Sequence, residues 1–134
     1  MKFIPHILII CFGIVLFACG SPSAATQKTT KEKPVVIAND SLEYEIIIFD
    51  LGFTQYLNSI AQPVGFYTQN YLENRNRFYV AEWNNRVNNP AVFDPNIYEN
   101  IINYDNNVNY GYDVNYKLFN YFEFAQRKYR MTLR

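Results

Sequence analysis

Histidine and cysteine are nearly absent from this sequence. Its 134 residues include one histidine, His6, and two cysteines, Cys11 and Cys19. The chain beyond position 19 therefore carries neither imidazole nor thiol, which excludes His-dependent triads and the usual nitrogen and sulfur sites for zinc from that part. It also lacks the pair of cysteines that a disulfide would need there.

Glycine-rich loops and an excess of one charge are lacking as well. The five glycines are isolated from one another, so no loop of the kind that cradles phosphate is present. Twelve basic residues balance twelve acidic ones, and no net charge favours nucleic acid as a partner. We therefore expect no cofactor, no metal and no nucleic-acid partner.

A short apolar run lies near the N-terminus. It follows the positive start Met1-Lys2 and extends over about eleven residues, Ile7–Phe17, which is too short to span a bilayer. This pattern predicts a cleaved signal peptide over residues 1–18. The segment Leu16-Phe17-Ala18-Cys19-Gly20-Ser21 that follows resembles the lipobox of bacterial lipoproteins, although Phe17 departs from the commonest pattern. The alternative is an ordinary secretory signal in which Cys19 is incidental.

The resemblance to a lipobox implies that Cys19 is acylated and becomes the mature N-terminus. Each buried CH₂ of an acyl chain contributes about 0.8 kcal/mol, so two or three chains hold a protein on a membrane. Residues from Gly20 to about Lys33 have linker composition, and we assign residues 19–40 to the lipidated cysteine and a flexible linker. By the sorting rules of lipoproteins, the lack of Asp after Cys19 implies the outer membrane, with the domain on the periplasmic side.

Residues 41–134 are predicted to form the folded domain. Alternating β-formers indicate a strand over Leu42–Asp50. Thr54 is a candidate N-cap for a short helix over Gln55–Ala61, and a longer helical pattern covers about Tyr67–Asn88. Residues 98–104 fit either a short strand or a helix opened by Asp94-Pro95, and the sequence leaves that choice open.

A last amphipathic helix is predicted from Asp113 as N-cap. Its apolar positions fall within about 100° of arc; they are Val114, Leu118, Tyr121, Phe122, Ala125 and Tyr129. Basic residues near its C-terminus complement the helix dipole, which explains them without a phosphate partner. We therefore expect an α+β fold, a small single domain with two or three helices packed on one or a few strands.

The long helix carries a row of charged residues through an aromatic face. Arg75, Glu82 and Arg86 project between two rows of apolar side chains, one of which contains Trp83. One interpretation is a salt-bridged stripe at the edge of the core, with Glu82 pairing with Arg86. The other is an interaction surface formed by Arg75, Glu82, Trp83 and Arg86, because Trp and Arg are frequent in binding hot spots.

A carboxylate pair of the glycosidase type is compatible with the sequence, but carboxylates carry no specificity by themselves. The candidates are Asp50, Glu82, Asp94 and Asp105. We predict no enzymatic activity and no catalytic residue.

Asp105, Asn107 and Asn109 match the first positions of a calcium-binding loop, but Tyr110 stands where glycine belongs. An Asn-rich turn explains them better.

Several segments together resemble a family of short Bacteroidota lipoproteins of unknown function. Besides the lipobox, they are Phe49–Phe53, Arg77–Asn84, Phe93–Pro95 and Asp113–Leu118. The resemblance implies a lipid-anchored membrane protein and gives no activity.

Our functional expectation is an envelope lipoprotein acting as a non-enzymatic module that binds an envelope protein. The alternative is a periplasmic glycan- or peptide-binding lipoprotein, for which exposed Tyr and Trp at a groove would be the discriminating feature. Tyr116, Phe119 and Phe124 lie off the apolar arc of the last helix, and we expect them to be buried.

Overall fold

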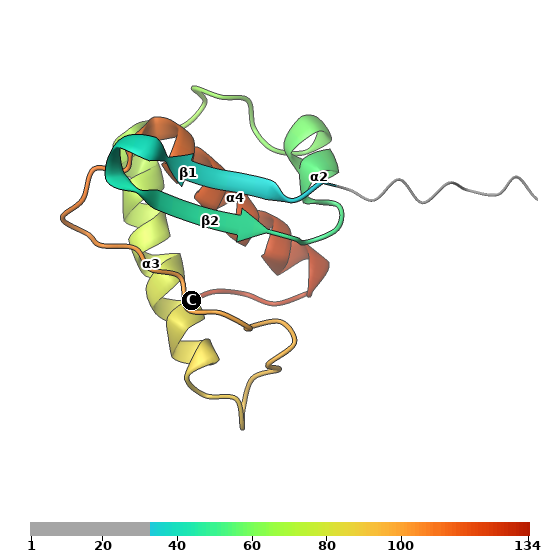
Figure 1. Ribbon diagram of the computed structural model, residues 1–134. Helices are drawn as coiled ribbons and strands as arrows, with labels where there is room; N and C mark the ends of the chain where they lie inside the picture. Colours follow the sequence, from blue (N-terminus) through green and yellow to red (C-terminus); the bar gives the residue numbers. More distant parts are fainter. Residues whose placement is uncertain (1–32) are drawn as a thin grey trace, which may run out of the picture. The chain divides into compact units, whose positions relative to one another are not determined.

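A short β-hairpin packs beside three α-helices in the computed structural model, which describes residues 33–134 (Figure 1). Strand β1 (Val35–Asn39) leads through a 3₁₀ turn, η1 (Asp40–Leu42), to strand β2 (Tyr44–Ile48). Helices α2 (Phe53–Ser59), α3 (Gln69–Val87) and α4 (Gly111–Lys128) follow. The predicted α+β fold is confirmed. The predicted signal peptide and Cys19 lie outside the described residues.

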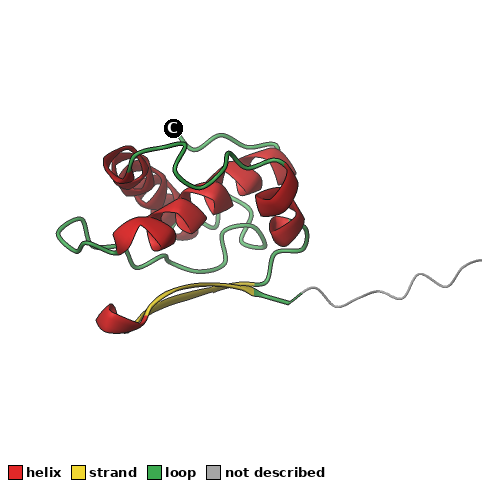
Figure 2. Cartoon of the chain, turned by 90° about the horizontal axis from the view of Figure 1, so that it is seen from above, coloured by secondary structure: helices red, strands yellow, loops and turns green. Residues whose placement is uncertain are grey.

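The two strands pair antiparallel, with Val35 opposite Ile48 and Val36 opposite Ile47. Because side chains alternate along a strand, the sheet has an inner and an outer face. Ile48 is buried on the inner face, whereas Val36 and Ile47 are 43% and 48% exposed on the outer face. Viewed from above, the strands lie along one side of the domain and the helices lie on the other (Figure 2).

Two predicted boundaries near the hairpin were wrong. The linker assigned to residues 19–40 includes β1, whose apolar residues pair with β2 over Val35–Asn39. The strand predicted over Leu42–Asp50 is shorter, because Leu42 belongs to η1 and Glu43 takes a left-handed backbone conformation with φ 51°. The error at β1 has a physical reason: a short apolar segment becomes a strand only when another strand is available to pair with it.

The helices were predicted in number and place, with shifted ends. The N-cap of helix α2 is Gly52 and not Thr54. The backbone at this position has a φ of 93°, a conformation that favours glycine. In α3, Thr68 is the N-cap and accepts a hydrogen bond from the Tyr71 backbone. Asp113 lies within the first turn of α4 and is not its N-cap, because the helix already begins at Gly111.

Helices α3 and α4 run in the same direction, and residues 88–110 return the chain between them (Figure 1). Later residues of α3 contact later residues of α4, as expected for parallel helices. Asn76 Nδ2 donates to the Asn115 carbonyl at 2.9 Å, and Tyr79 Oη donates to Glu123 at 2.7 Å. Residues 98–104 form neither strand nor helix. The largest fully buried side chains are Phe53, Phe122, Ile37, Leu72, Leu118, Val114, Asn76 and Asn115.

Helix α4 is the central element of the core, because α2, α3 and β1 all contact it. It is therefore buried on several sides. Tyr116, Phe119 and Phe124 are only 8%, 4% and 7% exposed, which confirms the expected burial of the aromatics off its main apolar arc.

Candidate functional site

The charged row of α3 lies at the boundary between the core and solvent. On one side Tyr79 and Trp83 are buried, and on the other Tyr71 and Phe78 are 43% and 48% exposed. Arg75 donates a hydrogen bond to the hydroxyl of Tyr79, and its guanidinium lies 4.6 Å from the centre of that ring. This position matches the interpretation of a stripe at the edge of the core.

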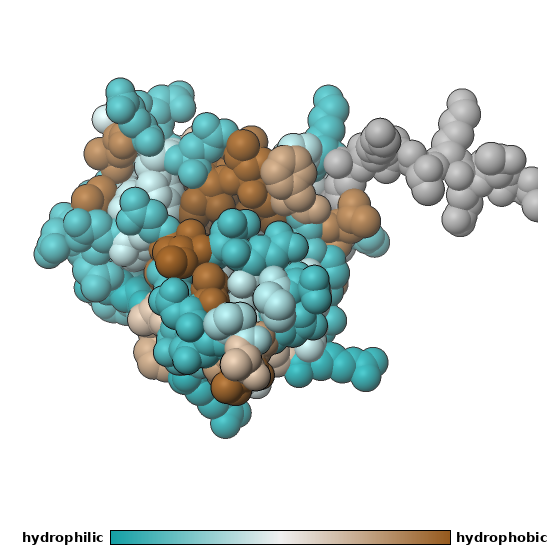
Figure 3. Space-filling model, turned by 60° about the horizontal axis from the view of Figure 1, so that its bottom comes forward, coloured by the Kyte–Doolittle hydropathy of each residue, from teal (hydrophilic) through white to brown (hydrophobic). Residues whose placement is uncertain are grey.

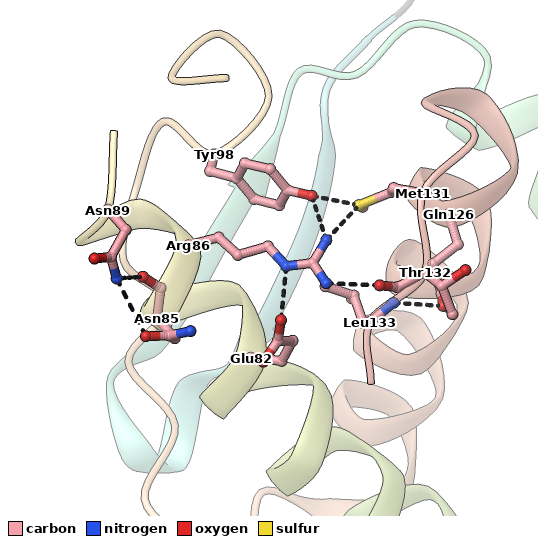
Figure 4. A network of polar contacts seen from close by, with 9 residues as sticks. All are labelled: Glu82, Asn85, Arg86, Asn89, Tyr98, Gln126, Met131, Thr132 and Leu133. Carbon is pink, nitrogen blue, oxygen red and sulfur yellow. Dashed lines mark hydrogen bonds and ion pairs between the residues drawn. The ribbon is translucent and has the colours of Figure 1, made fainter. Parts of the chain in front are cut away.

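Arg86 is the centre of a polar network that joins α3 to two distant segments (Figure 4). Its Nε lies 2.8 Å from Glu82 Oε1, which confirms the predicted ion pair. The guanidinium also donates to the Tyr98 hydroxyl at 2.8 Å and to the Thr132 carbonyl at 2.6 Å. The side chain of Arg86 is 11% exposed, so its charged group interacts with partners inside the domain.

Trp83 likewise has a structural position. It is 3% exposed, and its indole N–H donates to the Asn100 carbonyl at 3.0 Å. Of the four residues proposed as an interaction surface, Arg75 alone is exposed. Trp83 and Arg86 hold α3 to other segments, and Glu82 pairs with Arg86 within the helix. The structure thus brings three of them into the packing of the domain and does not form one open surface from all four.

The candidate carboxylates are engaged by partners within the domain. The Tyr129 hydroxyl lies 3.0 Å from both carboxylate oxygens of Asp50 and donates its hydrogen to this carboxylate, which also pairs with Lys128. Asp94 and Asp105 each accept a backbone N–H two residues onward, at 2.9 and 2.8 Å. The predicted Asn-rich turn at residues 105–107 is therefore confirmed. Within residues 33–134, no three His, Cys, Asp or Glu side chains form a group that could hold a metal.

A pocket of about 270 Å³ lies between β2 and the segment of residues 96–102. One wall is formed by five consecutive residues, Ile46–Asp50, and the opposite wall by residues 96–102. Trp83, Tyr121 and Tyr129 complete it from α3 and the end of α4. The volume is at the lower end of small-molecule sites, so the pocket suits side chains or a small ligand.

The wall at residues 96–102 is fixed to α3. The Asn84 side chain donates to the Ile102 carbonyl and accepts the Ile102 N–H, both at 2.8 Å, which imitates the pairing of a strand. Trp83 holds Asn100, and Arg86 holds Tyr98. The pocket is therefore formed without a ligand.

The polar groups of the pocket give it a negative character. Asp50 and Glu99 both line it, and no Lys or Arg does. Burial raises the pKa of the Tyr121 hydroxyl well above its usual value, and the charges of Asp50, Tyr129 and Glu99 raise it further. A tyrosine hydroxyl is protonated at neutral pH, and Tyr121 lines the pocket, so its hydroxyl is a hydrogen-bond donor beside the two carboxylates.

The aromatic rings of the pocket provide little open surface. Trp83 is 3% exposed, and Tyr121 and Tyr129 are half-buried. A sugar stacks on an open ring face, so this site lacks the feature that would favour glycan binding.

Apolar side chains are exposed beside the pocket. On the outer face of the sheet and at its end, Val36, Ile47, Phe49 and Leu51 are 43%, 48%, 75% and 69% exposed. Figure 3, which turns the bottom of the first view forward, shows brown, hydrophobic areas among teal, hydrophilic residues on the face that it presents. Exposed apolar residues gathered in this way are typical of binding surfaces.

Sequence reasoning missed this site because its parts are distant in the chain. Tyr121 was assigned to the apolar arc of a helix, and Glu99 lies in a segment without periodicity. The one local signal was the run of apolar residues in Ile46–Phe49, which leaves both faces of β2 apolar although one of them meets solvent.

Comparison with known proteins adds a family. No curated protein and no solved structure matches the chain. In the part that the structure describes, no helix is both long and apolar enough to cross a membrane. The sequence model of a family of unknown function, DUF6146, matches residues 6–134, and the chain therefore belongs to that family.

Proposed function

We propose that this protein is a lipid-anchored protein of the bacterial outer membrane whose periplasmic domain is a non-enzymatic module that binds another envelope protein. The supporting observation is β2 with the residues that directly follow it, where exposed apolar side chains at Ile47 and Phe49 meet a pocket along Ile46–Asp50. The candidate carboxylates are engaged in structural contacts, which favours binding over catalysis. The anchor is Cys19, on the basis of the apolar run and the segment Leu16–Ser21.

The anchor predicts a specific loss on substitution. Cys19→Ala removes the sulfur that would carry the lipid, so the protein should move from the membrane fraction to the soluble fraction and change its electrophoretic mobility. Fractionation of cells with immunoblotting measures both. A Cys11→Ala copy is the control and should behave as the unchanged protein. A Cys19→Ala copy that stays membrane-bound with unaltered mobility would refute the anchor.

The binding surface predicts site-dependent cross-linking in intact cells. A photo-reactive residue placed at Ile47 should give one defined product, because this side chain is exposed beside the pocket. The same residue at Asn74, which is exposed on α3, is the matched control and should give none. Products that are the same from both positions, or that come from position 74 alone, would contradict a partner on β2.

A further inference from the structure

We propose that the pocket beside β2 receives an extended segment of the partner that carries a basic side chain, and that this segment adds to the sheet as a third strand. The proposal rests on the proposed function above and specifies the chemistry of its partner.

The outer edge of β2 is free. The sheet has two strands, and β2 pairs with β1 on one edge. Within residues 33–134, no backbone hydrogen bond reaches residues 44–48 from another segment. Because alternate backbone groups of a strand point to opposite edges, some of the N–H and C=O groups of β2 are directed away from β1. An extended peptide binds by satisfying such groups.

The pocket lies beside the second half of β2. Its wall consists of Ile46–Asp50, which covers the second half of β2 and the two residues after it. A segment lying along β2 would therefore place side chains in the pocket on one face of the sheet. Ile47 and Phe49 belong to this wall and are 48% and 75% exposed, so they would contact apolar residues of the same segment.

The charges select the side chain. Asp50 is neutralised in part by Lys128, whereas Glu99 has no ion-pair partner within the described residues. Both carboxylates are near Tyr121, since both raise its pKa. An Arg or Lys of the partner would complete this arrangement, and an acidic side chain would be repelled.

Tyr121 supplies a hydrogen-bond donor in the wall of the pocket. Its hydroxyl makes no hydrogen bond to another described residue, and it is protonated at neutral pH. A backbone carbonyl of the added strand would accept this hydrogen bond. The walls are already held by Trp83 and Asn84, so binding requires little ordering of the pocket.

The chain contains its own reporter for the test. Trp83 is the only tryptophan and lines the pocket, so occupancy should change its fluorescence. The mature chain is titrated with a ten-residue peptide of alternating Val and Thr that carries one central Arg. We expect saturable binding, at least about tenfold weaker binding when Glu replaces the Arg, and no binding when alternate peptide nitrogens are methylated.

Two variants locate the site. Glu99→Gln should weaken binding of the Arg peptide about two- to fivefold, in the range of an exposed ion pair. Tyr121→Phe should weaken binding of the Arg and the Glu peptide alike. Asp40→Asn, which removes an exposed carboxylate at the other end of the hairpin, is the matched control and should change nothing.

Four results would overturn the inference. They are no binding of the Arg peptide at millimolar concentration, equal binding of the methylated peptide, equal binding of the Glu peptide, and full displacement of the peptide by an equal concentration of butylamine. The last would identify a site for small amines only. The cross-linking from position 47 is independent of these titrations, so a partner captured there together with a negative titration would refute the strand addition alone.

Discussion

Asparagines buried between helices are the most unusual residues of this core. Asn76 and Asn115 are fully buried, and Asn76 Nδ2 donates to the carbonyl of Asn115 at 2.9 Å and to its Oδ1 at 3.1 Å. The same Oδ1 accepts the Tyr104 hydroxyl at 2.7 Å. One asparagine on α4 thereby holds both α3 and the segment before α4.

Removal of this asparagine should be costly. Asn115→Ala leaves the Asn76 amide with one partner fewer and the Tyr104 hydroxyl without its acceptor, and it opens a small cavity. We expect the free energy of unfolding to fall by about 2–3 kcal/mol, measured by urea denaturation. Asn74→Ala on the exposed face of α3 is the control and should stay within about 0.5 kcal/mol of the unchanged protein. Equal effects of the two substitutions would contradict the role of Asn115.

The sequence did not predict these buried asparagines. On a helix, a polar residue is placed on the solvent face by default, because its burial is unfavourable without a partner. The partner of Asn76 is 39 positions away on another helix. Only the packing of α3 on α4 makes its burial favourable.

At the scale of elements, Arg86 connects α3 with the last residues of the chain. It bonds the Thr132 carbonyl, and the adjacent Leu133 N–H donates to Gln126 Oε1 at 3.0 Å. The side chain of Leu133 is 2% exposed, so the C-terminal segment packs into the core. Arg86 therefore joins the C-terminal end of α3 to the last residues of the chain.

Substitution of Arg86 should release this segment. Arg86→Ala leaves the partly buried Glu82 unpaired, and we expect a loss of about 3 kcal/mol in the free energy of unfolding. The amide of Leu133 should exchange its hydrogen faster, which NMR measures directly. Arg77→Ala, on the exposed side of the same helix, is the control and should leave that exchange unchanged. Unaltered exchange at Leu133 in the Arg86 variant would disprove the connection.

Prediction of elements succeeded where the signal is periodic. Helices α3 and α4 follow from apolar spacing, and the ion pair of Glu82 with Arg86 follows from their separation by four residues. The segment of residues 98–104 could not be assigned, because its path depends on contacts with distant side chains of α3 and not on a periodic pattern of its own. Strand β1 was missed since its pairing partner lies beyond a turn.

At the scale of the molecule, the tyrosines make stability depend on alkaline pH. Burial raises the pKa of Tyr104 to about 12, and burial also raises the pKa of Tyr44 and Tyr121 well above the usual value. In the unfolded chain a tyrosine loses its proton near pH 10. Above that pH the native state therefore binds more protons than the unfolded state, and stability decreases as pH rises.

We expect the titration of these tyrosines to leave the unfolding temperature unchanged up to about pH 9. From about pH 10 through 12 the unfolding temperature should fall steadily. Thermal unfolding followed by circular dichroism at increasing pH measures this. Tyr104→Phe should be less stable at neutral pH, because it loses the hydrogen bond to Asn115, and should show a smaller alkaline decrease. If the unfolding temperature of this variant decreases at alkaline pH as much as that of the unchanged protein, Tyr104 does not contribute to the pH dependence.

The α+β class, the place of each helix and the lack of His and Cys after position 19 follow from the amino-acid sequence, because they depend on composition and on local periodicity. Lipidation at Cys19 stays a prediction from the sequence. The structural roles of Trp83 and Arg86, and the pocket formed by β2, residues 96–102 and Tyr121, arise only in the packed fold. A pocket depends on residues far apart in the chain, and these residues come together only when the helices and the hairpin pack against one another.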